Sequence, residues 1–187
     1  MNQDPLFSMI ERVQNLWRSE ERSAGAEHGL LPVQIEVLGY LARCNRFSDT
    51  PSAVTRYLGV TKGTASQTIQ RLRERQLVEA VPDESDRRAL HLSLSKDGRQ
   101  VLRSLRPPET MVRAVESLSR SQIEGLTEGL DALLLELQRQ QERAGFGVCE
   151  TCRYHRVEGE RPFCGLLEER LSKSDGLKLC AEHEPPS

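Results

Sequence analysis

Four of the five cysteines in this 187-residue chain lie within its last 39 residues. Cys149 and Cys152 form a Cys-x-x-Cys pair, which lets two thiolates chelate one metal ion from a single tight turn. A chain reversal at 158–159 would bring Cys164 back, and Cys180 would complete a tetrahedron. Because so short a segment has little core of its own, a bound metal could supply its folding free energy. The pattern predicts one structural zinc site per chain.

Two other interpretations of this cysteine-rich tail stay open. The four thiolates could hold an iron–sulfur cluster, although spacings of two, eleven and fifteen intervening residues match neither common ferredoxin pattern. The cysteines could also bind no metal. Zinc is favoured, because clustered cysteines in a chain without a recognisable secretory signal suggest metal binding before disulfides.

The remaining histidine and cysteine candidates have more modest expected roles. His183 could replace one thiolate or donate a hydrogen bond to a metal ligand. His155 is expected to be an exposed hairpin residue. Cys44 lies near the end of an apolar helical segment, so we expect a buried small hydrophobe there and not a sensor thiol.

A second group of residues has side-chain types suited to reading DNA. Between Thr61 and Arg75, polar and basic residues alternate with Ala65, Ile69 and Leu72, which can face inward on a helix. Ser, Thr and Gln can bond to base edges or phosphates, and Arg and Lys can do either. The candidate contacts are Ser52, Lys62, Thr64, Ser66, Gln67, Gln70 and Arg71. The alternative is a solvated amphipathic helix without this role.

A charged hairpin is expected directly after this helix. Residues 77–81 and 89–94 alternate apolar and polar side chains, as half-buried strands do. The segment 82–88 between them is rich in turn-formers and charge. Arg87 and Arg88 would lie at the tip, placed to reach a phosphate or a narrow minor groove. A plain exposed turn is the alternative.

Helix-capping signals place these residues on defined elements. Thr50-Pro51 supplies a hydroxyl N-cap followed by proline at the first helical position, and that helix should end near Gly59. Thr61 can cap the next helix, which runs to about Arg75. Two helices joined by a tight glycine-containing turn form a helix-turn-helix unit.

Longer helices are expected on both sides of this unit. Residues 4–21 repeat apolar side chains on one face, residues 23–30 read as a loop, and Pro32 begins another helix. A further helix is expected to reach Leu105, and Pro107-Pro108 must kink or break it. A capping box at 121–124 opens a helix with an apolar stripe from Ile123 to Leu137.

Composition limits the class of protein. Net charge is −2, with 37% hydrophobic and 29% charged residues, a balance typical of soluble, helix-rich proteins. Residues 50–96 carry eight Lys or Arg against five Asp or Glu, a local net charge of +3 that is compatible with DNA. With no apolar run of ~20 residues and no signal peptide, a cytoplasmic location and no membrane partner are expected. No acid, base or nucleophile set predicts an enzyme.

The run from Leu30 to Leu137 resembles the MarR family of bacterial winged helix-turn-helix regulators. The resemblance is carried by VTKGTASQTIQRLRERQLV at 60–78 and by DESDRRALHLSLSKDG at 83–98. The second stretch is similar to the family's wing signature, in which an acidic turn with paired arginines precedes alternating strand residues and a closing glycine. Gln76 departs from the family, where glycine often follows the recognition helix. The cysteine-rich tail is not part of the common family plan.

The resemblance implies a homodimer in which the N- and C-terminal helices of two subunits interlock. Paired winged domains would bind a pseudo-palindromic operator with recognition helices roughly 34 Å apart. The stripe from Ile123 to Leu137 would then pack against a second subunit; a core helix within one chain is the alternative. Related proteins also bind a small aromatic or phenolic effector between the dimerisation helices and the winged domain.

These observations predict a mainly α-helical fold with a small β-hairpin. Four regions are expected: an N-terminal dimerisation helix and loop at 1–30, a winged helix-turn-helix domain at 31–98, C-terminal dimerisation helices at 99–144, and a metal-binding tail at 145–187. The predicted function is a sequence-specific transcriptional regulator, a repressor, responsive to a small ligand or to the redox or metal state of the tail. The alternative is a zinc-stabilised protein-interaction module fused to a DNA-binding domain, without a sensing role for the metal.

Overall fold

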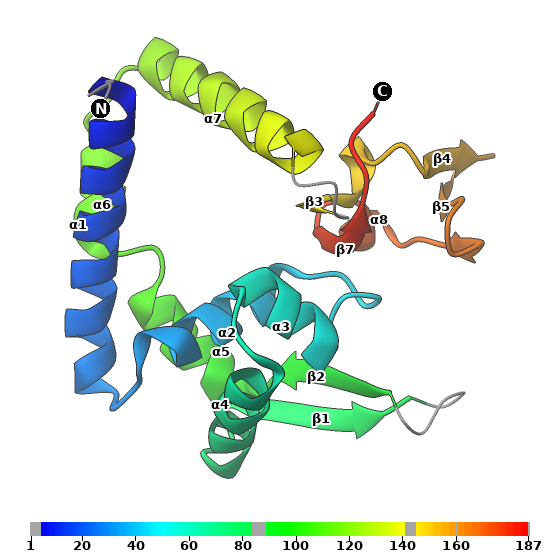
Figure 1. Ribbon diagram of the computed structural model, residues 1–187, viewed down its shortest axis with the longest axis horizontal. Coiled ribbons are helices and arrows are strands. Elements are labelled where there is room, and N and C mark those ends of the chain that lie inside the picture. The colour runs from blue at the N-terminus through cyan, green and yellow to red at the C-terminus, as the bar shows by residue number, and fades with distance from the viewer. Residues whose placement is uncertain (1–4, 84–88, 141–144, 160, 187) are drawn as a thin grey trace.

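The computed structural model describes residues 5–83, 89–140, 145–159 and 161–186. Within these ranges the protein is mainly helical with three small antiparallel sheets, as expected for its fold class. Figure 1 shows the winged unit at the bottom, the outer helices to its left and above it, and a folded C-terminal tail at the upper right. None of the described helices is long and apolar enough to cross a membrane.

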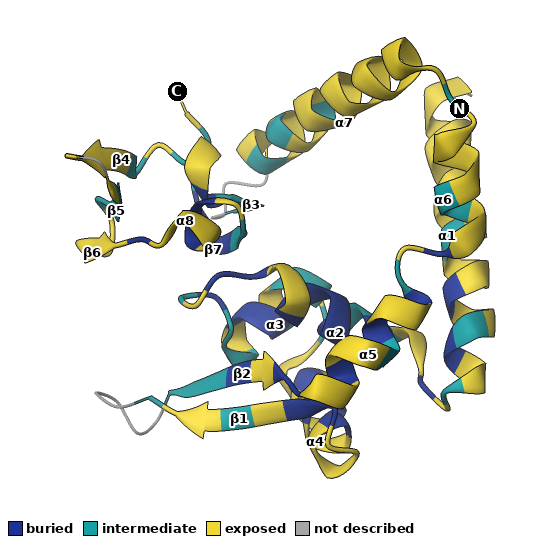
Figure 2. Ribbon diagram, turned by 180° about the vertical axis from the view of Figure 1, so that it is seen from behind, coloured by how far each residue is buried: buried dark blue, intermediate teal, exposed yellow. Residues whose placement is uncertain are grey.

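The winged unit is built from four helices and a hairpin. Its elements are α2 (Pro32–Arg43), α3 (Pro51–Leu58), α4 (Lys62–Glu74), β1 (Val78–Pro82), β2 (Leu90–Leu94) and α5 (Lys96–Leu105). Their apolar faces meet in one core, dark blue in Figure 2, where Ile35, Leu38 and Leu72 are fully buried. Since each such side chain contributes roughly 1.5–3 kcal/mol when buried, this core fixes how α4 is presented.

Local caps define the two helices of the helix-turn-helix. The Thr50 hydroxyl accepts from the Ala53 amide at 3.2 Å, and the Thr61 hydroxyl accepts from the Thr64 amide at 3.2 Å. Gly59, with φ 64°, ends α3 in the left-handed conformation that glycine adopts without strain. The sequence signals for both helix starts are therefore confirmed.

The hairpin that follows α4 has a regular register. β1 and β2 pair antiparallel from Val78 opposite Leu94 to Pro82 opposite Leu90. At its base, Gly98 in the first turn of α5 packs so closely on the chain that an added Cβ would lie 2.0 Å from the Leu77 carbonyl oxygen. Only glycine allows α5 to approach the strand in this way.

Three helices lie outside the winged unit. α1 (Pro5–Glu27) contacts α2 and α5, and its buried Glu21 forms an ion pair with Arg106. α6 (Glu109–Glu116) and α7 (Arg120–Gln140) contain no buried residue among those described. In Figure 1, α7 runs from beside the N-terminal end of α1 toward the tail. The last two helices therefore leave large faces uncovered by the described residues.

The tail folds into short strands, one 3-10 turn and one short helix. Its elements are β3 (Gly145–Val148), a 3-10 turn η1 (Cys149–Thr151), β4 (His155–Glu158), β5 (Arg161–Cys164), β6 (Glu169–Arg170), α8 (Lys173–Gly176) and β7 (Leu179–His183). β3 pairs with β7, and β4, β5 and β6 form a separate three-stranded sheet. The sequence predicted a hairpin around His155 but set no bounds for the strands, because runs of two to five residues carry almost no periodicity.

Two local expectations were wrong, and one helix was missed. Residues 23–27, expected in a loop, continue α1, because Gly25 packs against Ile35 and the helix end is held by tertiary contacts. The cap of α7 is at Ser119 and not at Ser121: the Ser119 amide donates to Gln122 at 2.9 Å, and the Gln122 amide donates back at 3.3 Å. The helix α6 was not anticipated from the sequence.

Candidate nucleic-acid interface and cysteine tail

The outer face of α4 carries the proposed DNA contacts. Ala65, Ile69 and Leu72 are buried, as expected, whereas all the α4 candidates are exposed: Lys62, Thr64, Ser66, Gln67, Gln70 and Arg71. Ser52 is also exposed, in the first turn of α3. A helix N-terminus that presents hydroxyl, amide and cationic side chains can hydrogen-bond to base edges and phosphates.

Two of these candidates also make bonds within α4. The Thr64 hydroxyl lies 2.9 Å from the Thr61 hydroxyl, and the Gln70 amide donates to the Glu74 carboxylate at 2.9 Å. DNA contacts from Thr64 and Gln70 would compete with these bonds. Arg75 donates to the carbonyls of His28 and Gly29, each at 2.7 Å, and so anchors the end of α4 to the turn after α1.

The expected wing arginines, Arg87 and Arg88, lie outside the described residues. The structure does define the hairpin that leads to them. The Asp83 amide donates to the Ala89 carbonyl at 3.0 Å, which extends the pairing of β1 and β2 by one step. Their contact with DNA therefore remains a prediction from the sequence.

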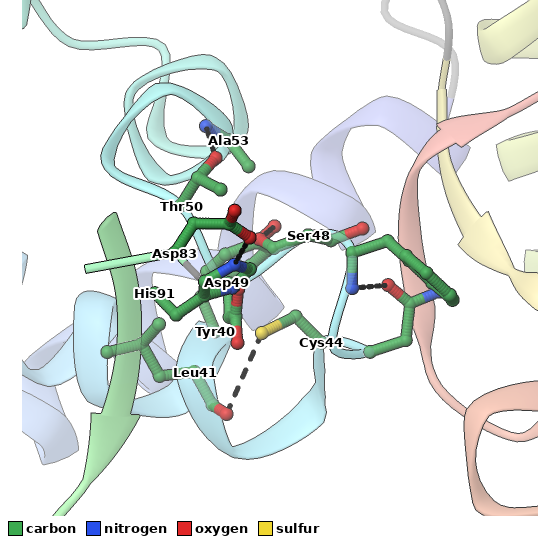
Figure 3. Close-up of polar contacts among 11 residues, drawn as sticks. Tyr40, Leu41, Cys44, Ser48, Asp49, Thr50, Ala53, Asp83 and His91 are labelled. Atoms are coloured by element: carbon green, nitrogen blue, oxygen red, sulfur yellow. Dashed lines mark hydrogen bonds and ion pairs between the residues drawn. The ribbon is translucent and has the colours of Figure 1, made fainter. Parts of the chain in front are cut away.

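The loop of residues 44–50 connects α2 to α3 and contacts the hairpin (Figure 3). The Asp49 carboxylate lies 2.6 Å from Nδ1 of His91 on β2, and the other ring nitrogen lies 2.9 Å from Asp83. The Leu92 amide also donates to the Asp49 carbonyl at 2.7 Å. The position of the hairpin relative to α3 is thus set partly by Asp49, which directly precedes the cap residue Thr50.

The charge of this Asp–His–Asp group is shaped by its surroundings. Hydrogen bonds to Asp83 and Asp49 raise the pKa of His91, whereas burial raises the pKa of Asp49 despite the opposing effect of His91. The sequence did not reveal the group because Asp49 and Asp83 lie 42 and 8 residues before His91 in the chain. The available signal was a histidine inside an otherwise regular strand.

The tail brings its cysteines toward one another. All four are free thiols; Cys149 and Cys180 are buried in a cluster with Leu171, against which Cys164 packs. Burial raises the pKa of Cys149 to about 12, with further increases from the thiols of Cys180, Cys164 and Cys152. Among the described residues, no group of three or more His, Cys, Asp or Glu side chains is arranged to hold a metal ion as it stands.

His183, His155 and Cys44 differ in their surroundings. His183 is only 2% exposed; its Nε2 lies 3.0 Å from the Thr151 hydroxyl, its Nδ1 has no partner among the described residues, and burial lowers its pKa. His155, expected to be exposed, is half-buried at the start of β4, where it pairs with Cys164. Cys44 is buried, as expected, and burial raises its pKa to about 12, the opposite of an activated thiol.

The tail docks on α3 and on the 44–50 loop. The Asn45 amide donates to the Leu179 carbonyl at 2.9 Å, and the Ala181 amide donates to the Ser48 hydroxyl at 2.8 Å. Arg56 of α3 reaches the Ala181 carbonyl at 2.7 Å. Phe146 of β3 packs edge-on against Tyr40 and Tyr57. The same loop that holds the hairpin therefore also holds the tail, an arrangement that the sequence did not predict.

The fold and the exposed α4 face define the class as a winged helix-turn-helix protein. Residues 28–89 match a model described as the MarR family. A comparison with curated proteins finds no match.

Solved structures show the same fold. Streptococcus pneumoniae FabT in complex with DNA is 25% identical, with 75% of this chain and 99% of that chain covered and a TM-score of 0.59. A MepR–DNA complex from S. aureus is 20% identical, covering 72% and 97%, with a TM-score of 0.55. Wild-type MarR from E. coli in its apo form is 20% identical, covering 70% and 98%, with a TM-score of 0.54. Each of these proteins is matched almost entirely, whereas about a quarter of this chain lies outside the match.

Proposed function

We propose that this protein is a sequence-specific DNA-binding transcriptional regulator that acts as a homodimeric repressor. The observation that carries the proposal is the exposed polar and cationic face of α4, presented by a capped helix-turn-helix beside a hairpin. Similar folds occur in FabT and MepR, which were solved with DNA. Repression is proposed because blocking a promoter requires only that the protein occupy it.

The proposed contacts divide into two kinds. Ser66 and Gln67, in the exposed face of α4, would read base edges in the major groove, whereas Lys62 and Arg71 would contact phosphates or guanine. Ser52 at the start of α3 would position the unit on the backbone. The wing arginines would add phosphate or minor-groove contacts next to the helix.

The exposed apolar faces of the outer helices support a homodimer. On α7 the exposed residues recur at helical spacing: Ile123, Leu126, Leu130, Leu134 and Leu137, each between 37% and 56% exposed. α1 adds Phe7, Val13 and Leu16. Apolar surface of this extent is a sign of a protein interface, and a second copy presenting the same helices would cover it.

The proposed input has two versions. In the first, a small aromatic effector binds between the dimerisation helices and the winged domain; an open cavity of about 350 Å³ there is lined by His28 and by Val101, Ser104 and others from α5. In the second, the metal or redox state of the docked tail is the signal. The competing function is a tail that serves only as an interaction module, which its separate three-stranded sheet would allow.

The proposed function can be tested by selecting duplexes from a random DNA pool with the purified full-length protein. Enrichment of a pseudo-palindrome with half-sites about one helical turn apart is expected. The selected duplex should bind far more tightly than a scrambled one at physiological salt. A pool that shows no enrichment after repeated rounds would contradict sequence-specific binding.

A further inference from the structure

Three of the four tail cysteines, Cys149, Cys164 and Cys180, belong to one small buried cluster or pack against it. Cys149 begins η1 and Cys152 directly follows it, while Cys164 ends β5 and Cys180 lies in β7 opposite Gly147 of β3. The cluster contains Leu171, while Phe47 from the 44–50 loop packs against it. Because thiols from three different elements converge here, the tail has the ligand types and the topology of a thiolate metal site.

Hydrogen-bond donors are directed at two of the four sulfur atoms. The Glu184 amide donates to Sγ of Cys152 at 3.4 Å, and the backbone of Glu182 bonds to Cys180. The side chains of Asn45 and Ser48 also lie beside Cys180. N–H groups directed at sulfur are typical of metal-bound thiolates, whereas a neutral thiol is a weak acceptor.

Asn45 supplies an independent sign that a charged acceptor belongs at Cys180. Its side chain is 1% exposed, yet its Nδ2 has no hydrogen-bond partner of ordinary geometry among the described residues. A buried donor without a partner is costly. A metal-bound Cys180 thiolate beside it would supply the acceptor that a neutral thiol provides only weakly.

The tail has only a small apolar core of its own. The buried apolar residues described after residue 144 are Cys149, Leu171, Cys180 and Ala181, so two of the four are themselves cysteines. Small domains with so little core usually depend on a metal or on disulfides, and these cysteines are free. Among the described residues, the thiols are not yet gathered as metal ligands. Binding would therefore draw the half-buried Cys152 and Cys164 toward the two buried thiols.

The Cys180 strand is bonded directly to the loop that sets the DNA-binding geometry. Next to Cys180, Ala181 donates to the Ser48 hydroxyl, while the Ser48 carbonyl accepts from the Tyr40 hydroxyl at 2.6 Å. The neighbouring Asp49 holds His91 on β2 (Figure 3). A movement of the Cys180 strand is therefore passed to the start of α3 and to the hairpin through consecutive residues.

We propose that Cys149, Cys152, Cys164 and Cys180 bind one Zn²⁺ ion per chain, and that the filled tail holds the 44–50 loop in its DNA-binding geometry. The metal site does not depend on the proposed function, whereas its effect on DNA binding rests on it. Loss of the ion loosens the Cys180 strand and weakens operator binding. The tail is thus the sensing element and not a passive appendage.

Metal content of the full-length protein, purified without oxygen, tests the site. One zinc per chain and a colourless solution are expected, and Cys152→Ser and Cys164→Ser should each lose the ion. Cys44→Ser, which changes the cysteine outside the tail, should keep it. Iron and sulfide with absorption near 400 nm would overturn zinc in favour of a cluster, and protein that takes up no zinc after incubation with the ion would overturn the site altogether.

The coupling is tested by measuring the affinity of the wild-type chain for the selected duplex before and after chelation. Chelation should weaken binding at least tenfold, and added zinc should restore it. In Ser48→Ala, which breaks the bond to Ala181 but leaves the Ser48 carbonyl in place, chelation should change affinity less than threefold. An equal response in both proteins would overturn the proposed route. Zinc-loaded protein that prefers no duplex would instead contradict the proposed function and leave the metal result intact.

Discussion

Among single residues, His91 has a charge state that the fold controls through two carboxylates. It lies between Asp49 and Asp83, and its hydrogen bonds to Asp83 and Asp49 raise its pKa. A histidine with a raised folded-state pKa stabilises the fold fully below its unfolded value of about 6.5. This stabilisation is lost as pH rises through the folded value. Burial also raises the pKa of Asp49. Protonation of this carboxyl therefore stabilises the fold at lower pH, and this contribution is likewise lost as pH rises.

His91→Gln should remove this pH dependence while keeping a hydrogen-bonding side chain. Urea titrations would give the free energy of unfolding for both proteins. The wild type should be more stable than the variant by a wider margin near pH 6 than near pH 8.5, since only the wild type can gain the proton. His28→Gln, in the turn after α1, is the matched control. A margin that is constant over this range would contradict a stabilising proton on His91.

Gln76 is the residue at which this chain departs from the MarR-like pattern, and its backbone is left-handed, with φ 57°. Gln76→Gly should raise the free energy of unfolding by roughly 0.5–1 kcal/mol, because removing the side-chain strain outweighs the extra entropy of the unfolded chain. Gln70→Gly, inside α4, should lower it by about 1 kcal/mol. Thermal unfolding measures both, and a loss of stability in the first variant would show that Gln76 carries no such strain.

At the scale of secondary-structure elements, the helix-turn-helix could be predicted because its signals are local. Thr50, Gly59 and Thr61 act within three or four residues of their own positions, and the structure places each as expected. The end of α1 could not be predicted, since it depends on Gly25 meeting Ile35. The His91 group was missed for the same reason, because its main partner lies in another element.

The wing is the element whose contact with DNA rests on sequence alone. Replacing Arg87 and Arg88 together with Ala should weaken binding to the selected duplex and make it less dependent on salt, because fewer counterions are released. Fluorescence anisotropy at several salt concentrations measures both effects. Replacing the exposed Arg103 of α5 and Arg113 of α6 with Ala provides a control of equal charge. Unchanged affinity in the wing variant would mean that the hairpin does not touch DNA.

At the scale of the whole molecule, the tail and the outer helices were the hardest to predict. The tail meets the winged unit largely through backbone groups, such as the Leu179 carbonyl and the Ala181 amide, that leave no side-chain pattern. These groups lie far along the chain from their partners, Asn45 and Ser48. The apolar stripe on α7 was visible in the sequence, but its proposed partner is a second copy of the chain.

Leu130→Glu should weaken the homodimer, because it places a charge in the middle of the exposed apolar stripe of α7. Light scattering over a concentration series should show the dissociation constant raised at least tenfold. Leu177→Glu, at a 68% exposed position in the tail, should leave the dimer intact. A monomeric wild type, or equal masses for the two variants at every concentration, would contradict a dimer through α7.

The most direct test of DNA binding through α4 compares three variants on the selected duplex. At ~0.1 M salt, Lys62→Ala and Arg71→Ala should each weaken binding at least tenfold and lower the salt slope by about 1 for each phosphate that the variant no longer neutralises. Arg103→Ala, which removes an exposed charge from α5, should bind like the wild type. DNA binding through α4 would be contradicted if all three variants bound equally well, or if the wild type bound a scrambled duplex as tightly as the selected one.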